Sequence, residues 1–337
     1  MKYSVIIPVY NRPGELRELL DSLSAQKFRD FEVIVVEDGS AIPSSEVVKE
    51  FANSLDIKYF VKENGGPGPA RNFGAERSGG EYLIILDSDV ILPQGYFDAV
   101  ETGLSLYGLD AFGGPDRSHP DFTPVQKAIS YAMTSFFTTG GIRGGGKALD
   151  KFYPRSFNMG VRGEVFNLLK GFSPMRFGED IDLSIRIFKC GYRCRLIPDA
   201  WVWHKRRTDL RKFFRQVHNS GIARINLYKK WPDSLKLVHL LPALFTIGCT
   251  LLAVLAFFWP WALLPLLLYA LAIFIDSLLK SIREGYSRPL QISLLSVAAS
   301  FVQLIGYGSG FIRAWFIRCV LGRGNDDLQA FKNNFYK

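Results

Sequence analysis

Cysteine is scarce in this chain of 337 residues, and its arrangement excludes the common cysteine-based sites. The four cysteines, Cys190, Cys194, Cys249 and Cys319, form no C-x-x-C pair, and the last two lie in or beside apolar runs. Neither a disulfide framework nor a zinc site is indicated. The first apolar run also lacks a small-residue cleavage site, so it predicts a strand and no signal peptide. We therefore expect the N-terminal half to stay in the cytoplasm.

Excess charge of either sign is absent from the first 208 residues, where 26 Lys and Arg balance 26 Asp and Glu. The formal net charge of +9 lies beyond them, where 15 basic residues face 6 acidic ones. That part also carries long apolar runs, so its basic surplus favours anionic lipid head groups over nucleic acid. We expect membrane lipids as partners and no nucleic acid.

Four short apolar runs in the first half predict buried parallel strands, at residues 3–9, 31–36, 57–61 and 82–86. Between the first two runs, leucines recur at helical spacing from Leu16 to Leu23, after Pro13, a favoured first residue of a helix. Strands that alternate with helices predict an α/β fold with a doubly wound, mostly parallel sheet.

Polar or glycine-rich residues follow each of these four runs, at residues 10–11, 37–40, 64–67 and 87–89. In doubly wound sheets, ligands bind beyond the carboxyl ends of the strands, so we expect one site assembled from four loops. Residues 110–151 show no periodicity and include the glycine-rich stretch 139–147. This segment is interpreted as an irregular, mobile loop over the site.

Two carboxylates, Asp87 and Asp89, come directly after the fourth run. Closely spaced hard oxygen ligands suit Mg²⁺ or Mn²⁺ held together with substrate phosphates, although a D-x-D triplet alone is a weak signal. His204 is either a packed histidine or a further metal ligand, and the arginines after it can pair with pyrophosphate oxygens. Arg71 lies near the start of a predicted helix whose sequence is neither a phosphate-binding loop nor a dinucleotide motif.

Glu179 and Asp180 precede a helical apolar pattern, and two interpretations stay open for them. They can simply favour the helix N-terminus, where negative charge is stabilising. Alternatively one of them is a general base, because a sugar hydroxyl is a poor nucleophile near pH 7 until a carboxylate accepts its proton.

Three apolar runs, at residues 237–259, 260–279 and 289–312, are each about long enough to cross a hydrocarbon core of roughly 30 Å. Residues 208–231 instead mix apolar and basic side chains, which is typical of an interfacial amphipathic helix, with an ordinary solvated helix as the alternative.

The basic residues around these runs give conflicting signals about topology. Lys280, Arg283 and Arg288 predict that the loop between the second and third runs is cytoplasmic. A third full crossing would then put a basic tail outside, against the same tendency. The glycines at 306, 308 and 310 are candidates for breaking the third run into a re-entrant segment, and the side of the tail stays open.

Read together, seven motifs resemble glycosyltransferase family 2, in the order typical of that family and across residues 3–207. They are Pro8-Val-Tyr-Asn11, Glu37-Asp38-Gly-Ser40, Gly66-Pro-Gly-Pro-Ala-Arg71-Asn72, Asp87-Ser-Asp89, Asn158-Met159, Gly178-Glu-Asp180 and His204-x-x-Arg207. The resemblance implies the GT-A fold and an inverting single displacement. It also implies a nucleotide diphosphate sugar, UDP- or GDP-linked, that binds with Mg²⁺ or Mn²⁺.

The resemblance also implies roles for particular residues. The nucleotide sugar would contact Pro8, Tyr10, Asn11, Glu37, Asp38, Arg71, Asp87 and Arg207, and the metal would be held by Asp87, Asp89 and His204. Asp180 becomes the catalytic base, with Glu179 as its neighbour or an acceptor contact. One departure is Glu37, where many relatives have a second aspartate. Beyond residue 208 the likeness is looser and points to membrane-bound bacterial members that build succinoglycan-type surface polysaccharides.

These observations predict a catalytic domain at residues 1–208, an interfacial helix at 209–235, about three transmembrane helices at 236–313 and a basic tail at 314–337. The leading hypothesis is sugar transfer to a hydroxyl of a lipid-linked glycan. The chain would be a multi-pass protein of the inner (cytoplasmic) membrane, with its catalytic domain facing the cytoplasm. A synthase that charges polyprenyl phosphate is the alternative, although its anionic acceptor needs no base.

Two further functions are less well supported by the sequence. A processive polysaccharide synthase is disfavoured because residues 214–219 lack the Q-x-x-R-W element of that class. A transporter or channel with a soluble sensor domain is disfavoured because only Asp276 is ionisable well inside an apolar run.

Overall fold

The computed structural model describes residues 1–140, 152–175 and 177–323 of the chain. The chain divides into two compact units. Of the described residues, the first unit holds 1–117, 152–175 and 177–204, and the second holds 118–140 and 205–323. The glycine-rich stretch expected at 139–147 lies mostly outside the described residues.

A seven-stranded sheet forms the centre of the first unit, in the order β3-β2-β1-β4-β8-β6-β9. Its strands are β1 (Tyr3–Val9), β2 (Phe31–Asp38), β3 (Ile57–Lys62), β4 (Tyr82–Leu86), β6 (Ala111–Gly113), β8 (Asn158–Arg162) and β9 (Cys194–Leu196). The four strands predicted from the sequence pair in parallel, and β8 runs antiparallel to both β4 and β6. The predicted mixed α/β fold with a mostly parallel sheet is confirmed.

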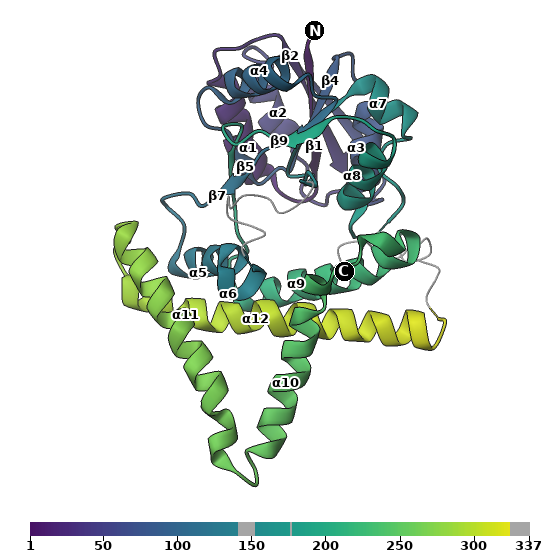
Figure 1. Cartoon of the computed structure of the whole chain (residues 1–337). Helices are drawn as coiled ribbons and strands as arrows, with labels where there is room; N and C mark the ends of the chain where they lie inside the picture. The colour runs from purple at the N-terminus through teal and green to yellow at the C-terminus, as the bar shows by residue number, and fades with distance from the viewer. Residues whose placement is uncertain (141–151, 176, 324–337) are drawn as a thin grey trace. The chain divides into compact units, whose positions relative to one another are not determined.

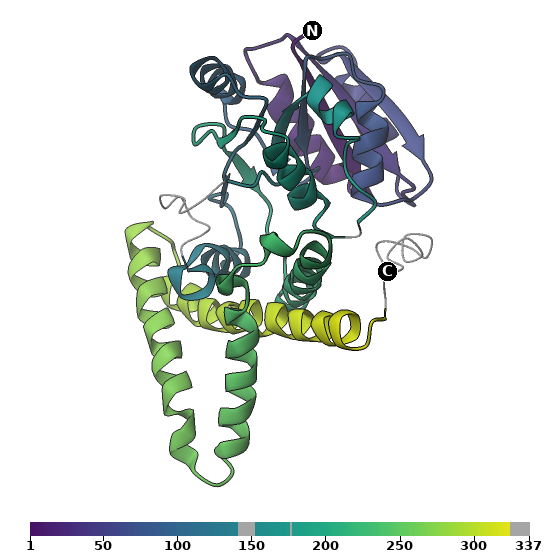
Figure 2. The same cartoon turned by 45° about the vertical axis from the view of Figure 1, so that its right-hand side comes forward.

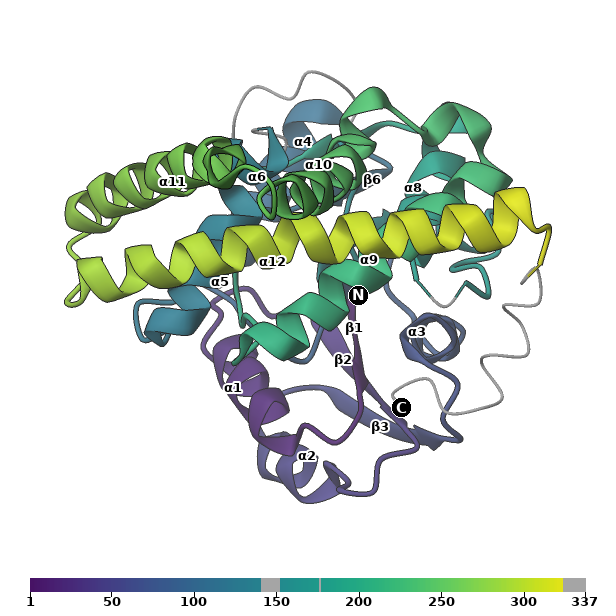
Figure 3. The ribbon, with the colours of Figure 1, turned by 90° about the horizontal axis from the view of Figure 1, so that it is seen from below.

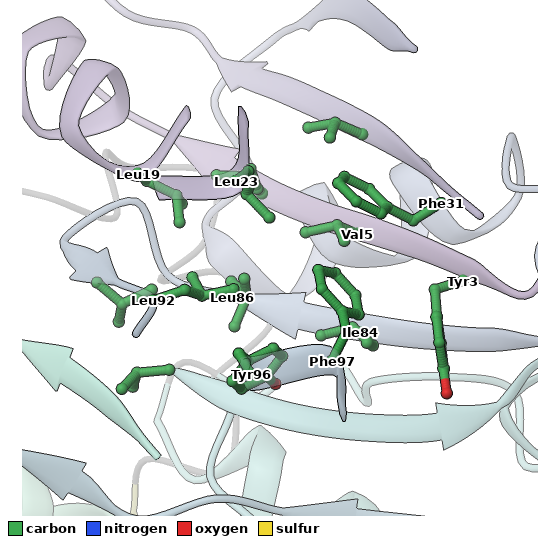
Figure 4. Close-up of a cluster of buried hydrophobic side chains, with 14 of the residues drawn as sticks. Tyr3, Val5, Leu19, Leu23, Phe31, Ile84, Leu86, Leu92, Tyr96 and Phe97 are labelled. Atoms are coloured by element: carbon green, nitrogen blue, oxygen red, sulfur yellow. The ribbon is translucent and has the colours of Figure 1, made fainter. Parts of the chain in front are cut away.

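Helices cover this sheet, as the alternating sequence pattern predicts (Figure 1). They are α1 (Pro13–Ser24), α2 (Ser45–Phe51), α3 (Pro67–Ala75), α4 (Tyr96–Tyr107), α7 (Gly163–Leu168) and α8 (Glu179–Lys189). Figure 4 shows part of the core, where Phe97 of α4 stacks on Phe31 of β2 with ring centroids 4.7 Å apart, beside Tyr3 of β1. This core anchors the strands whose carboxyl ends carry the polar residues.

A second, three-stranded sheet has the order β5-β10-β7 and was not predicted. It consists of β5 (Val90–Ile91), β10 (Val202–His204) and β7 (Asp116–Arg117). Strand β5 begins directly after Asp89, and its register places His204 opposite Val90. The small sheet therefore brings His204 to the loop that carries Asp87 and Asp89.

The second unit is helical. Its elements are α5 (Pro124–Thr134), α6 (Phe136–Thr139), α9 (Leu210–Lys230), α10 (Leu241–Leu255), α11 (Leu264–Arg283) and α12 (Pro289–Trp315), with short turns η1 (Pro232–Ser234), η2 (Leu237–His239), η3 (Pro260–Leu263) and η4 (Phe316–Val320). The irregular structure expected across 110–151 is wrong for α5 and α6. Helix α5 begins at Pro124 behind a complete capping box between Thr123 and Gln126, a signal present in the sequence.

Three segments of the second unit are long and apolar enough to cross a membrane: Leu237–Leu255, Pro260–Arg283 and Pro289–Val320. They correspond to the three predicted runs. Helix α9 coincides with the predicted amphipathic segment, but Phe213 and Val217 on its apolar face are buried against α5 and α12, so protein covers much of that face. Its interfacial location stays a prediction.

The three glycines of the third run, considered as candidates for a break, do not interrupt the helix. Helix α12 continues through Gly306, Gly308 and Gly310, and these glycines serve as close packing positions. A Cβ at Gly310 would lie 2.0 Å from the carbonyl oxygen of His218 in α9. Glycine is required here because α9 and α12 approach each other through their backbones.

Candidate active site

The carboxyl ends of β2 and β4, the end of β10 and the start of α8 carry most of the predicted site residues of the first unit. Asp38 ends β2, Asp87 follows β4, and His204 is the last residue of β10. Glu179 and Asp180 form the first turn of α8, behind Gly178, which adopts a left-handed conformation (φ 88°). A glycine suits this position because other residues rarely adopt such a φ.

Asp87, Asp89 and His204 form a group that could hold a metal ion, with one potential ligand atom from each lying within 4.8 Å of the others. His204 Nε2 is 3.2 Å from an Asp89 carboxylate oxygen, while Nδ1 faces Asp116 at 3.9 Å. A carboxylate behind a ligating imidazole is the usual arrangement around protein metals, because it orients the ring. Carboxylate oxygens suit Mn²⁺ or Mg²⁺, so the two aspartates fit the predicted cation.

Packing also fixes the orientation of the imidazole. The ring of Phe157 stacks on His204 with centroids 4.8 Å apart and an interplanar angle of 27°. Because one face of the ring is covered and Nδ1 faces Asp116, Nε2 is directed toward Asp89. The packed and ligating interpretations of His204 are therefore compatible: packing supports the geometry that ligation needs.

Two arginines hold the acidic pair in place. Arg12 donates to Asp89 at 2.7 Å, and the buried Arg71 donates to Asp87 at 2.7 Å. Burial disfavours the charged form of both guanidinium groups, but the neighbouring carboxylates outweigh it and raise the pKa of each arginine. Arg12 was missed by the sequence analysis. Its place one residue beyond the polar end of β1 was the only signal, and that signal says nothing about its partner.

Arg71 also donates to Glu179 at 2.9 Å, which links α3 to the start of α8. Burial of Glu179 and repulsion from Asp180 raise the pKa of Glu179 to about 7, against the opposing effect of Arg71. The buried Glu179 carboxyl group thus contacts the same arginine that holds Asp87.

Asp180 is placed differently from its neighbour. Its side chain is 14% exposed and lies 3.5 Å from the guanidinium of Arg155, another residue that the sequence analysis missed. One carboxylate oxygen accepts a hydrogen bond from the backbone N–H of Ile181 at 2.7 Å, as a residue at a helix N-terminus does. Its other oxygen is the one that faces Arg155. Of the two acidic residues, Asp180 is the one whose carboxylate is not committed to a buried arginine.

Glu37 and Asp38 are buried and organise the loops around the sheet edge. Glu37 accepts hydrogen bonds from the Ser44 backbone N–H and the Tyr59 hydroxyl, at 2.7 and 3.0 Å. Asp38 accepts from the backbone N–H groups of Gly65 and Gly66 at 2.9 and 2.8 Å. The bonds of Asp38 thus shape the loop before α3, while those of Glu37 tie the end of β2 to Ser44 and to β3.

The remaining predicted residues are divided between the two units. Pro8 is buried in β1 opposite Val36, and Tyr10 follows that strand. Asn11 has a left-handed backbone (φ 54°) and its side chain accepts from the backbone N–H of Ile42 at 3.0 Å. Arg207 belongs to the second unit, so its proposed contact with the diphosphate stays a prediction.

The Glu179→Gln variant is expected to have a free energy of unfolding that depends less on pH than that of the unmodified chain. The pKa of Glu179 in the folded chain, about 7, exceeds its ordinary value of 4.5, so the folded state prefers the protonated form. That contribution is complete below pH 4.5 and is lost as the pH rises toward 7. The two proteins should therefore diverge by roughly 1–3 kcal/mol across this interval.

Thermal unfolding of the full chain in detergent and EDTA, at several pH values in that interval, measures this difference. Glu164→Gln is the control, because Glu164 also lies in the first turn of a helix but is exposed. Parallel pH profiles for Glu179→Gln and the unmodified chain would contradict the assignment.

Comparison with known proteins identifies the family. The model of "Glycosyl transferase family 2" matches residues 4–121, and that of "Glycosyl transferase family group 2" matches residues 82–275, more than half of the chain. An "Uncharacterized glycosyltransferase" of Rickettsia felis is 34% identical over 41% of this chain and 22% of its own length. "Poly(ribitol-phosphate) beta-N-acetylglucosaminyltransferase TarS" of Staphylococcus aureus is 41% identical over 26% of this chain and 16% of its own. The match thus spans at most about a fifth of each of these two relatives.

Among solved structures, the mannosyltransferase PcManGT from Pyrobaculum calidifontis, in complex with GDP-Man and Mn²⁺, has a TM-score of 0.53. It is 20% identical, and the similarity covers 89% of this chain and 87% of that one. At this identity the likeness concerns the fold alone. The ordered motifs, the GT-A-like sheet and the extent of the family match lead to one assignment. The chain belongs to glycosyltransferase family 2.

Proposed function

We propose that this chain transfers a sugar from a nucleotide diphosphate sugar, UDP- or GDP-linked, to an acceptor hydroxyl with inversion at the anomeric carbon. The observation that carries the proposal is the convergence of Asp87, Asp89 and His204 at the carboxyl edge of the sheet. A cation held by these residues would offset the negative charge of the donor diphosphate. The similar mannosyltransferase carries GDP-Man and Mn²⁺ in its structure, which supports the same chemical class of donor and cation.

In this mechanism, Asp87, Asp89 and His204 would hold Mg²⁺ or Mn²⁺. When bound, the cation neutralises the charge that develops on the departing nucleoside diphosphate. Arg12 and Arg71 fix the two aspartates through ion pairs, and Glu179 positions Arg71. These contacts keep the ligands in place before the donor arrives, which lowers the cost of assembling the site.

Asp180 would take the proton of the acceptor hydroxyl as its oxygen attacks the anomeric carbon. A base within hydrogen-bond reach of the nucleophile is required for this step, because the hydroxyl is not ionised near pH 7. A polyprenyl phosphate acceptor is already an anion and needs no such group. The partly exposed carboxylate of Asp180 therefore favours a hydroxyl acceptor.

A lipid-linked glycan is the acceptor that best suits a chain with three candidate membrane-crossing segments. The hydroxyl of such a glycan stays at the membrane surface, because its lipid is held in the bilayer. We place the reaction at the cytoplasmic face, where nucleotide sugars are made and where the basic residues around the apolar segments are expected.

Donor screening tests this function. The full chain in detergent is incubated with a panel of UDP- and GDP-sugars and Mn²⁺, and release of the nucleoside diphosphate is recorded. We expect slow hydrolysis of one donor or a few related donors, and faster release when a lipid-linked glycan is added. Acceleration by polyprenyl phosphate instead would favour the synthase. Failure of every donor to bind or react would overturn the proposal.

A further inference from the structure

Helices α10 and α11 form a hairpin, and α12 runs crosswise at its base, as Figures 1 and 2 both show. Helix α10 meets α12 at its first turns. A Cβ at Gly308 would lie 2.3 Å from the carbonyl oxygen of Pro242, and the rings of Phe245 and Phe301 lie 5.7 Å apart. Farther along α10, Leu251 and Val254 are more than half exposed, as is Phe257 just after the helix. The hairpin thus projects away from α12 with little protein around it.

The side of α12 that faces away from the hairpin is covered by α5 and α9. Figure 3 shows α12 lying across these two helices. Ala299 of α12 is buried in one cluster with Ala128 of α5 and Phe213 of α9. Two segments, 19 and 24 residues long, lead to and from the tip of the hairpin. At 1.5 Å per residue they measure about 28 and 36 Å, which matches a hydrocarbon core of roughly 30 Å. A helix that runs crosswise to both cannot cross the same bilayer.

We infer that α10 and α11 alone cross the membrane. Helix α12 lies along the membrane surface at the base of the hairpin, called the near surface below, and carries α5 and α9 on the face that points away from the lipid. Three segments are apolar enough to span a membrane, but in this arrangement the third, which contains α12, lies parallel to the membrane plane. The inference goes beyond the proposed reaction, because it concerns how the lipid surface is bound and on which side the chain leaves α12.

The distribution of charge supports this topology. Basic residues flank α12 at both ends, with Arg283 and Arg288 before it and Arg313, Arg318 and Arg323 at or after its C-terminal end. A third crossing would place the two groups on opposite sides of the membrane. With α12 in the plane, all of them lie on one side, as basic residues near membrane segments tend to do.

The two ends of the hairpin are equally distinct. Its tip carries Trp259 and Trp261, both more than half exposed, and residues 240–275 contain no Asp, Glu, Lys or Arg. Tryptophan is enriched at membrane–water interfaces, so the tip fits the far surface. At the base, Asp276 of α11 accepts a hydrogen bond from the hydroxyl of Tyr131 in α5 at 2.6 Å. This ionisable group therefore lies beside α5, at the near surface and outside the apolar core.

Cysteine labelling tests the topology. The background chain has Cys190, Cys249 and Cys319 replaced by serine and keeps the buried Cys194. Single cysteines are then introduced in three variants: Ser287→Cys before α12, Arg323→Cys after it, and Phe258→Cys at the hairpin tip. All three positions are exposed. A membrane-impermeant maleimide is applied to intact cells and to inside-out vesicles, and labelling in detergent confirms that each thiol is reactive.

We expect positions 287 and 323 to be labelled only in inside-out vesicles and position 258 only in intact cells. Labelling of position 323 in intact cells would restore a third crossing and overturn the inference. Protection of position 323 on both sides would also overturn it, because the chain should leave α12 in water. Nucleotide-sugar hydrolysis by each variant is measured in parallel, so a failed topology is distinguished from a failed activity.

Discussion

The Asp180→Asn variant is expected to lose sugar transfer by about 10² to 10⁴-fold in kcat while donor affinity changes little. Asparagine has nearly the same size and shape as aspartate, but it cannot accept the proton of the acceptor hydroxyl. The metal group at Asp87, Asp89 and His204 is untouched by this change, so donor binding should survive. Binding of the donor by calorimetry and turnover with the acceptor are the two measurements.

The competing interpretation of Asp180 is a purely structural one, since its carboxylate accepts a hydrogen bond from the backbone N–H of Ile181. Asparagine offers an acceptor in the same place and also stabilises helix N-termini, so this interpretation predicts a nearly normal enzyme. Asp98→Asn is a matched control, because Asp98 lies exposed in the first turn of α4. An active, folded Asp180→Asn enzyme would make Glu179 the next candidate base and would revive polyprenyl phosphate as the acceptor.

The second large effect concerns the metal. We expect EDTA to abolish turnover, Mn²⁺ or Mg²⁺ to restore it, and Asp89→Ala to prevent the restoration. Asp89 is the centre of the group, with Arg12 on one oxygen and His204 near the other. Its loss therefore removes a ligand and also releases the two groups that frame it.

Asp116→Asn provides a graded comparison, because Asp116 faces the outer nitrogen of His204 and is not itself a predicted ligand. Changes behind a metal ligand typically lower metal affinity by about 10 to 100-fold, so this variant should need more Mn²⁺ but reach substantial turnover. Titration of Mn²⁺ against turnover and against donor affinity separates the variants, with Asp98→Ala as the control. Full turnover of Asp89→Ala in EDTA would remove the metal from the mechanism.

The sequence predicted the large sheet well because its signal is local. Buried parallel strands are apolar along their whole length, so strands β1 and β4 could be delimited to the residue and β2 to within two. Strand β3 was delimited to within one residue, but its predicted burial is wrong, because β3 lies at the edge of the sheet and Val61 is 65% exposed. The doubly wound arrangement then placed the acidic loops at one edge. This part of the site needed no knowledge of distant contacts.

The small sheet and the ion pairs of the site could not be predicted, because they depend on contacts between residues far apart in the sequence. Strands β5, β7 and β10 have two or three residues each, too few to show an alternation, yet their pairing brings His204 to Asp89. The partners of Arg12 and Arg155 lie 77 and 25 residues away in the chain. Helix α5 was missed for another reason. Thr123 and Gln126 form a local capping-box signal for its start, but it was overlooked within a segment interpreted as irregular.

The backbone contacts between α9 and α12 also constrain how the second unit is made. His218 and Ser309 hydrogen bond at 3.1 Å but are 91 residues apart in the sequence. At a synthesis rate of about 5–20 residues per second, α9 leaves the ribosome roughly 5 to 20 s before α12 can cover it. During that interval the face of α9 around Gly221, where the backbone of α12 later fits, has no partner from that helix. The hairpin of α10 and α11 is synthesised in between, so in the topology inferred above its insertion precedes closure of α12 onto α9.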